Sequence, residues 1–142
     1  MTNEQFIELK TAKLAKQAGF DWTCYKVYKD DITENNTLFT YTNKEGCNNK
    51  FNFLCSAPTQ SVLQRWLREI KKISVEIYHA IVLSSDGSIT IKWVYNAYYL
   101  NSNENSVVSS YEFDTFEDAL EAALQKCLSL IIEKERETTE RR

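Results

Sequence analysis

Two long runs rich in β-branched and aromatic residues, separated by five polar ones, constrain the fold of this chain most strongly. The runs cover residues 75–83 and 89–99, and residues 84–88 between them read SSDGS. An Asp-Gly pair between two β-rich runs is a strong hairpin signal. Alternate residues of a strand share a face. The more apolar face of the two runs holds Val75, Ile77, His79, Ile81 and Leu83 with Ile89, Ile91, Trp93, Tyr95 and Ala97.

The other segments predict three helices and shorter strands around this hairpin. The helices are expected from residue 3 to residue 18, from Pro58, and from Asp114 or Thr115. Shorter β-rich runs cover residues 22–29, 37–42 and 107–113, and residues 51–54 form either a strand or a loop. The expected order is α-β-β-(β)-α-β-β-β-α. Strands that follow one another as hairpins indicate an α+β fold, with a mainly antiparallel sheet of about four to six strands packed by three helices.

The length of 142 residues fits one domain, which we assign to residues 1–132. One proline, three glycines and 13% aromatic residues favour long regular elements. Residues 133–142 carry charged and polar side chains without an apolar one, which predicts a frayed helix end or a disordered tail.

The second helix has the clearest start and the clearest buried face. Pro58 suits the first helical position, where its missing N–H has no partner to lose. Thr59 is the rival start, as an N-cap residue. The expected buried stripe contains Val62, Leu63, Trp66, Leu67, Ile70 and Ile73.

Three blocks of this sequence resemble one group of proteins. Residues 56–69 read SAPTQSVLQRWLRE, residues 8–16 read ELKTAKLAK and are followed by Gly19 and Phe20, and residues 111–122 read YEFDTFEDALEA. Taken in chain order, the three blocks resemble small uncharacterised proteins of Bacteroides-type bacteria and of their phages or prophages. The group has no established activity, so the resemblance implies a mobile-element or viral origin and supplies no site residues.

The cysteines and the single histidine give weak support to a catalytic or metal site. Cys24, Cys47, Cys55 and Cys127 form no C-x-x-C pair, and the spacing is atypical of zinc sites. A catalytic thiol needs a nearby base, and His79 is the sole histidine. Its position in a predicted strand favours a structural role, although a Cys–His pair is left open. We expect buried, reduced thiols and no metal.

Acidic and glycine-rich motifs are similarly uninformative about catalysis. Glycines at positions 19, 46 and 87 exclude a Walker A or G-x-G-x-x-G loop. The acidic residues near the start of the last helix could do acid–base work, but they equally offset the positive end of the helix dipole. They are Glu112, Asp114, Glu117, Asp118 and Glu121. We therefore assign no catalytic residue and no cofactor.

The polar face of the second helix is the candidate binding surface predicted from the sequence. It consists of Gln64, Arg65, Arg68, Lys71 and Lys72. We expect a non-enzymatic accessory protein of phage or mobile-element type that binds another protein or itself. The alternatives are nucleic-acid binding through this basic face, against which the net charge of -3 argues, and a small Cys/His or acidic-site enzyme.

Neither a signal peptide nor a membrane-spanning apolar segment is recognisable in the sequence. We therefore expect a cytoplasmic protein of a bacterial host cell, with no membrane partner.

Overall fold

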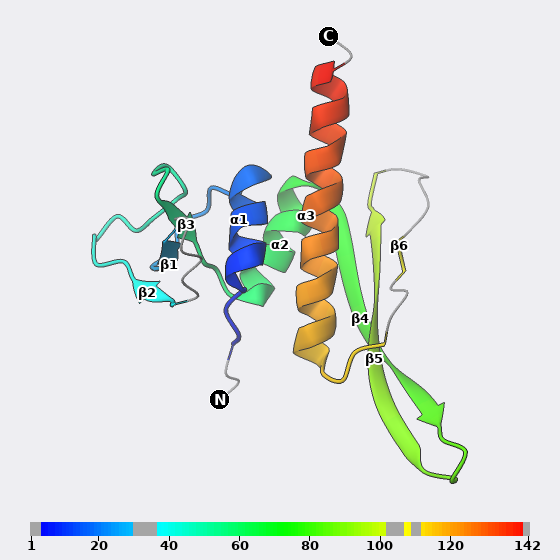
Figure 1. Ribbon diagram of the computed structural model, residues 1–142. Helices are drawn as coiled ribbons and strands as arrows, with labels where there is room; N and C mark the ends of the chain where they lie inside the picture. The colour runs from blue at the N-terminus through cyan, green and yellow to red at the C-terminus, as the bar shows by residue number, and fades with distance from the viewer. Residues whose placement is uncertain (1–3, 30–36, 102–106, 109–111, 141–142) are drawn as a thin grey trace.

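The computed structural model describes residues 4–29, 37–101, 107–108 and 112–140 (Figure 1). Every strand pair within these ranges is antiparallel, which confirms the expected α+β class. The elements in chain order are α1 (Leu9–Gln17), β1 (Lys26–Lys29), β2 (Phe39–Thr40), β3 (Leu54–Ser56), α2 (Gln60–Ile70), β4 (Ile73–Leu83), β5 (Ile89–Tyr99), β6 (Val107–Val108) and α3 (Phe116–Glu140).

Some sequence predictions fall outside the described residues. They are the helix start at residue 3 and the middle of the strand predicted at residues 107–113. In the described part of that last strand, β6 covers two residues and Phe113 forms an isolated bridge with Trp93.

The predicted hairpin is present and is the longest β structure of the fold. β4 and β5 pair in an unbroken register from Ile73 opposite Tyr99 to Leu83 opposite Ile89. The turn is closed by Asp86, whose Oδ1 accepts hydrogen bonds from the Ser88 backbone N–H (3.0 Å) and hydroxyl (2.7 Å). Gly87 has a φ of 87°, a conformation that glycine adopts without strain.

The six strands within the described residues are divided between two three-stranded sheets instead of forming one. The sheets have the orders β2-β1-β3 and β4-β5-β6. Figure 1 shows the three helices between them, with α1 beside β3 and α3 along β4 and β5. Each sheet thus buries one face against the helical layer. Two small sheets can meet this requirement for burial as well as one large sheet can.

The core lies where α2 meets α3 and the end of α1. Trp66 is 1% exposed, as expected, and its ring meets Phe20 edge to face at 5.3 Å between centroids. Leu63 and Leu67 are fully buried in the same cluster. The predicted stripe was wrong at Ile70, which is 53% exposed in the last turn, whereas Ile73 is buried but belongs to β4.

Two of the helices begin later than the preferred sequence signal indicated. The N-cap of α2 is Thr59, whose hydroxyl accepts from the Val62 N–H at 3.4 Å, so Pro58 precedes the helix and the rival start was right. Thr115 likewise caps α3 by accepting from the Asp118 N–H at 3.0 Å. The other candidate for that cap, Asp114, forms an ion pair with Lys92 instead.

The first helix is shorter than predicted because the segment before it pairs with another part of the chain. The Ile7 N–H donates to the Pro58 carbonyl at 3.1 Å, and the Gln60 N–H donates to the Gln5 carbonyl at 2.8 Å. α1 therefore begins at Leu9. In the last helix, α3 extends to Glu140, and residues 133–139 are exposed.

Candidate functional site

The predicted binding residues of α2 point to several different neighbours. The Gln64 side-chain amide donates to the Val75 carbonyl at 2.9 Å, so it serves the fold. The Arg65 guanidinium lies over the Trp22 ring, 5.0 Å from its centroid. Arg68 is exposed, and Lys72 is exposed just beyond the helix with a left-handed φ of 58°. The structure therefore places Arg65, Arg68 and Lys72 in solvent and directs Gln64 inward.

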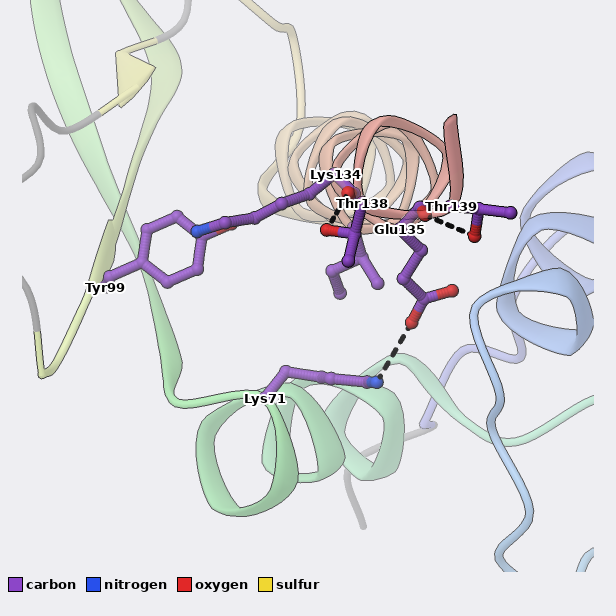
Figure 2. Close-up of a pocket in the computed structure, with 7 residues that line it drawn as sticks. Lys71, Tyr99, Lys134, Glu135, Thr138 and Thr139 are labelled. Atoms are coloured by element: carbon purple, nitrogen blue, oxygen red, sulfur yellow. Dashed lines mark hydrogen bonds and ion pairs between the residues drawn. The ribbon is translucent and has the colours of Figure 1, made fainter. Parts of the chain in front are cut away.

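Lys71 belongs to a separate hollow formed with the C-terminal half of α3. Its Nζ lies 3.6 Å from a Glu135 carboxylate oxygen and 5.6 Å from the Trp66 ring centroid. The hollow has a volume of about 610 Å³ (Figure 2). Its lining residues are Lys71, Tyr99, Ile131, Lys134, Glu135, Thr138 and Thr139.

The polar groups of this hollow interact with the chain itself. Lys134 Nζ lies 4.8 Å from the centroid of the Tyr99 ring, and Figure 2 shows it pointing at that ring while Lys71 points at Glu135. The Thr138 and Thr139 hydroxyls donate to backbone carbonyls of α3 at 3.0 Å. The hollow thus presents charges that already have partners, and we assign it no ligand.

The most unusual surface is the end of the β4–β5 hairpin. Four aliphatic side chains are more than half exposed there: Ile81 (66%), Leu83 (72%), Ile89 (66%) and Ile91 (56%). Ile81 lies opposite Ile91 and Leu83 opposite Ile89, so all four share one face. We call these four residues the apolar tip.

The apolar tip continues the buried face of the same hairpin. Under the helices this face contains Val75, Tyr95 and Ala97, which are 6%, 8% and 3% exposed. Figure 1 shows the hairpin extending past the start of α3, so the helix covers one end of the face and leaves the other end open. Within the described residues, the apolar face of the hairpin is therefore longer than the part of it that the helices cover.

Aromatic rings mark the border between the covered and open parts. The Trp93 ring meets Phe116, in the first turn of α3, edge to face at 5.6 Å. His79 meets the other side of Trp93 at 5.8 Å. Phe116 is 40% exposed, so the border itself adds aromatic surface to the apolar tip.

The outer edge of β4 is the second notable feature of the hairpin. Trp93 exchanges two backbone hydrogen bonds with Phe113, of 2.7 and 2.8 Å, so its N–H and C=O point away from β4. Its partner His79 must then point its own N–H and C=O away from β5. The same holds for every second residue of β4, and Val75 uses its outward carbonyl to accept from Gln64.

Beyond Val75 the outward backbone groups have no hydrogen-bond partner in the part of the chain that the structure describes. These groups belong to Ile77, His79, Ile81 and Leu83, which we call the open edge. Natural edge strands are usually blocked by a lysine, a proline or a bulge. Residues 77–83 contain no lysine or proline, and their register with β5 has no bulge.

Two of the cysteines, Cys24 and Cys127, lie in environments that suppress thiolate formation. Burial raises the pKa of Cys127 to about 12. Burial, with a smaller contribution from Cys47, raises the pKa of Cys24 to about 12 as well. All four cysteines are buried and reduced, whereas His79 lies on the exposed part of the hairpin.

Among the acidic residues near the start of α3, Glu121 has a structural role. The Glu121 carboxylate is 4% exposed and accepts from the Gln60 side-chain amide (2.9 Å), the Glu8 backbone N–H (3.1 Å) and the Thr11 hydroxyl. It thereby ties the starts of α1 and α2 to α3. Across the described residues, no group of three or more His, Cys, Asp or Glu side chains is placed to hold a metal ion.

The fold and the hairpin together define a small α+β protein whose β4–β5 hairpin carries an exposed apolar surface. No protein-family model, curated protein or solved structure matches the chain. Within the described ranges, none of the helices combines the length and apolar character needed to cross a membrane.

The sequence placed all four residues of the apolar tip on one strand face but did not identify them as a site. The available signal was the length of the apolar alternation, which continues through both strands to the turn. How far a helix covers that face depends on tertiary packing, which strand periodicity does not report.

Proposed function

We propose that this chain is a non-catalytic accessory protein that binds another protein chain, including a further copy of itself, through its apolar tip. The observation that carries the proposal is that Ile81, Leu83, Ile89 and Ile91 lie together on one face and are each 56–72% exposed. Scattered exposed aliphatic residues are normal on a protein surface, but a contiguous group typically marks an interaction site.

The size of the surface supports a protein partner. Together the four side chains expose on the order of 500 Å², which is within the range of the largest apolar patch on a typical monomer, and such patches are often functional. Aliphatic residues beside an exposed aromatic such as Phe116 form the kind of desolvated centre that dominates binding energy.

The two alternatives have less support. Nucleic-acid binding requires a continuous basic surface, whereas Arg65 stacks on Trp22 and Lys71 pairs with Glu135. If that alternative held, Arg68→Glu combined with Lys72→Glu would weaken binding and flatten its salt dependence. A thiol enzyme requires an accessible thiolate, and the raised pKa values of Cys24 and Cys127 argue against one at those two positions.

Photo-crosslinking in cells of the source organism tests the proposal. Leu83 is replaced by p-benzoylphenylalanine, and the matched control carries the same replacement at Lys10, which is exposed on α1. We expect a discrete adduct from position 83, reduced at least fivefold when Ile91→Ser is added. An adduct yield from position 83 no higher than that from position 10 would refute the proposal.

A further inference from the structure

The open edge of β4 identifies the partner of the apolar tip. Building on the proposed function, we infer that the tip binds a second copy of this chain, and that the open edges of the two β4 strands pair antiparallel across a two-fold axis. The result is one continuous sheet that runs through both copies. Four observations support this geometry: the outward backbone groups, the length of the open stretch, its charge, and its area.

The outward backbone groups give the first reason. Ile77, His79, Ile81 and Leu83 each direct one N–H and one C=O away from β5, with no hydrogen-bond partner among the described residues. An antiparallel strand from a second copy presents the same groups in the opposite direction, so the two edges satisfy each other. Strand addition to an open edge is a recurrent mode of chain recognition.

The length of the open stretch sets the register. At one end Gln64 of α2 occupies the Val75 carbonyl, and at the other end β4 itself finishes at Leu83, before the turn. The open residues between these limits run from 77 to 83, and Ala80 is their midpoint. A two-fold axis at Ala80 aligns the two open stretches completely, with Ile77 opposite Leu83 of the second copy.

The charge of the stretch favours a second copy over an unlike partner. In a two-fold interface each group near the axis meets its own counterpart, so a charge there would face a like charge. Residues 77–83 carry no Asp, Glu, Lys or Arg. The neighbouring charges are already engaged, since Glu76 accepts from the Tyr98 hydroxyl at 2.8 Å and Lys92 pairs with Asp114.

The area indicates the strength of the dimer. Edge pairing places Ile81 and Leu83 of each copy beside His79 and Ile77 of the other, so it buries only part of the roughly 1,000 Å² that two apolar tips expose, which is less than a standard interface. We therefore expect a dimer that dissociates on dilution. Sedimentation equilibrium of the purified full chain from micromolar to millimolar concentration should give a mass that rises from 16.6 kDa towards twice that value.

Proline substitution tests the role of the edge separately from that of the side chains. His79→Pro removes an outward N–H that the fold does not use and leaves all four tip residues in place. The matched control, His79→Thr, keeps the N–H and the strand propensity. We expect His79→Pro to raise the dimer dissociation constant at least tenfold and His79→Thr to change it less than threefold, with unchanged far-ultraviolet circular dichroism in both.

Cysteine substitution tests the register. The backbone of Ala80 bonds to β5, so Ala80 meets its counterpart as a non-hydrogen-bonded pair, with Cα atoms about 4.5 Å apart. That spacing permits a disulfide, and Ala80→Cys should therefore form a covalent dimer on mild oxidation. Val82→Cys is the control, because Val82 faces Tyr78 of the second copy and its own counterpart lies about 13 Å further along the strand.

The possible outcomes separate this inference from the proposed function. A mass of 16.6 kDa at every concentration, or a dimer that His79→Pro leaves unchanged, would overturn the two-fold pairing. If position 83 still crosslinks to a different protein in cells, the proposed function holds and the inference of self-association fails. If position 83 gives no adduct and the chain is monomeric, both fail.

Discussion

The side-chain amide of Gln60 donates a 2.9 Å hydrogen bond to the carboxylate of Glu121, and both residues are 4% exposed. They begin α2 and occupy the second turn of α3, so this contact joins two elements that are distant in sequence. Because the same carboxylate also accepts from Thr11 and from the Glu8 N–H, its removal leaves three donors without an acceptor.

Glu121→Ala should therefore be strongly destabilising. Unsatisfied buried donors cost about 1–3 kcal/mol each when the structure does not relax, and we expect the free energy of unfolding to fall by about 3 kcal/mol. Glu121→Gln keeps one acceptor oxygen and should lose about 1–2 kcal/mol. Urea denaturation measures both, with the exposed first-turn Glu117→Ala as control. Equal losses for the alanine variants at 117 and 121 would contradict a structural role for Glu121.

Glu8 should make stability fall as pH rises. Partial burial, then the charges of Glu121 and Asp118, raise the pKa of Glu8 above its ordinary value of 4.5. The folded state therefore binds this proton more tightly than the unfolded state. The contribution of Glu8 to stability is greatest below pH 4.5 and decreases as pH rises through the folded pKa.

Glu8→Gln should remove this dependence. We expect its melting temperature to exceed that of the wild type at pH 7 and the difference to shrink below pH 4. The Glu8 side chain makes no capping hydrogen bond, so the substitution costs none. A constant difference from pH 3 to pH 7 would show that the protonation of Glu8 is not the cause.

Cys24 and Cys127 should react very slowly with alkylating reagents. A pKa of about 12 in place of 9.0 lowers the thiolate fraction about a thousandfold at pH 8. Iodoacetamide labelling followed by mass spectrometry should leave both residues unmodified in the folded protein and label both in urea. Labelling of either one at the rate of glutathione would contradict this environment.

Gly46 should tolerate a side chain much less well than Gly87. Both have positive φ, 72° and 87°, but a Cβ at position 46 would collide with Thr23 Cγ2 and lie 3.2 Å from the Cys24 carbonyl oxygen. At Gly87 it would meet nothing within 4 Å. We expect Gly46→Ala to lower the free energy of unfolding by about 3 kcal/mol and Gly87→Ala by about 1 kcal/mol. The ranking is read from urea midpoints, and a reversed order would refute it.

The hairpin could be predicted from sequence because its determinants are local. The Asp86–Gly87 turn and the alternation on either side specify the same register that the structure shows. The division into two sheets could not be predicted in this way, since it depends on which distant strands pair. Local signals also placed the start of α2 ambiguously, because the pairing of Pro58 and Gln60 with residues 5–7 decides it.

The candidate site required tertiary information. Sequence periodicity separated the polar residues of α2 from the core, but it gave no indication that Gln64 would bond to β4 or that Lys71 would meet Glu135. The apolar tip was visible as strand residues and became a candidate surface when the position of α3 showed that it leaves them uncovered. The exposure of a side chain depends on how neighbouring helices and strands pack together. The residue pattern of one strand does not contain that information.

The position of Glu121 also has a consequence for biosynthesis. The residues that begin α1 and α2 leave the ribosome first, but the acceptor for Thr11, Glu8 and Gln60 is carried by the last helix of the chain. The N-terminal half therefore completes its packing after α3 has been made, while the local β4–β5 hairpin can form earlier. A chain that stops before α3 would therefore leave the starts of α1 and α2 without their shared acceptor.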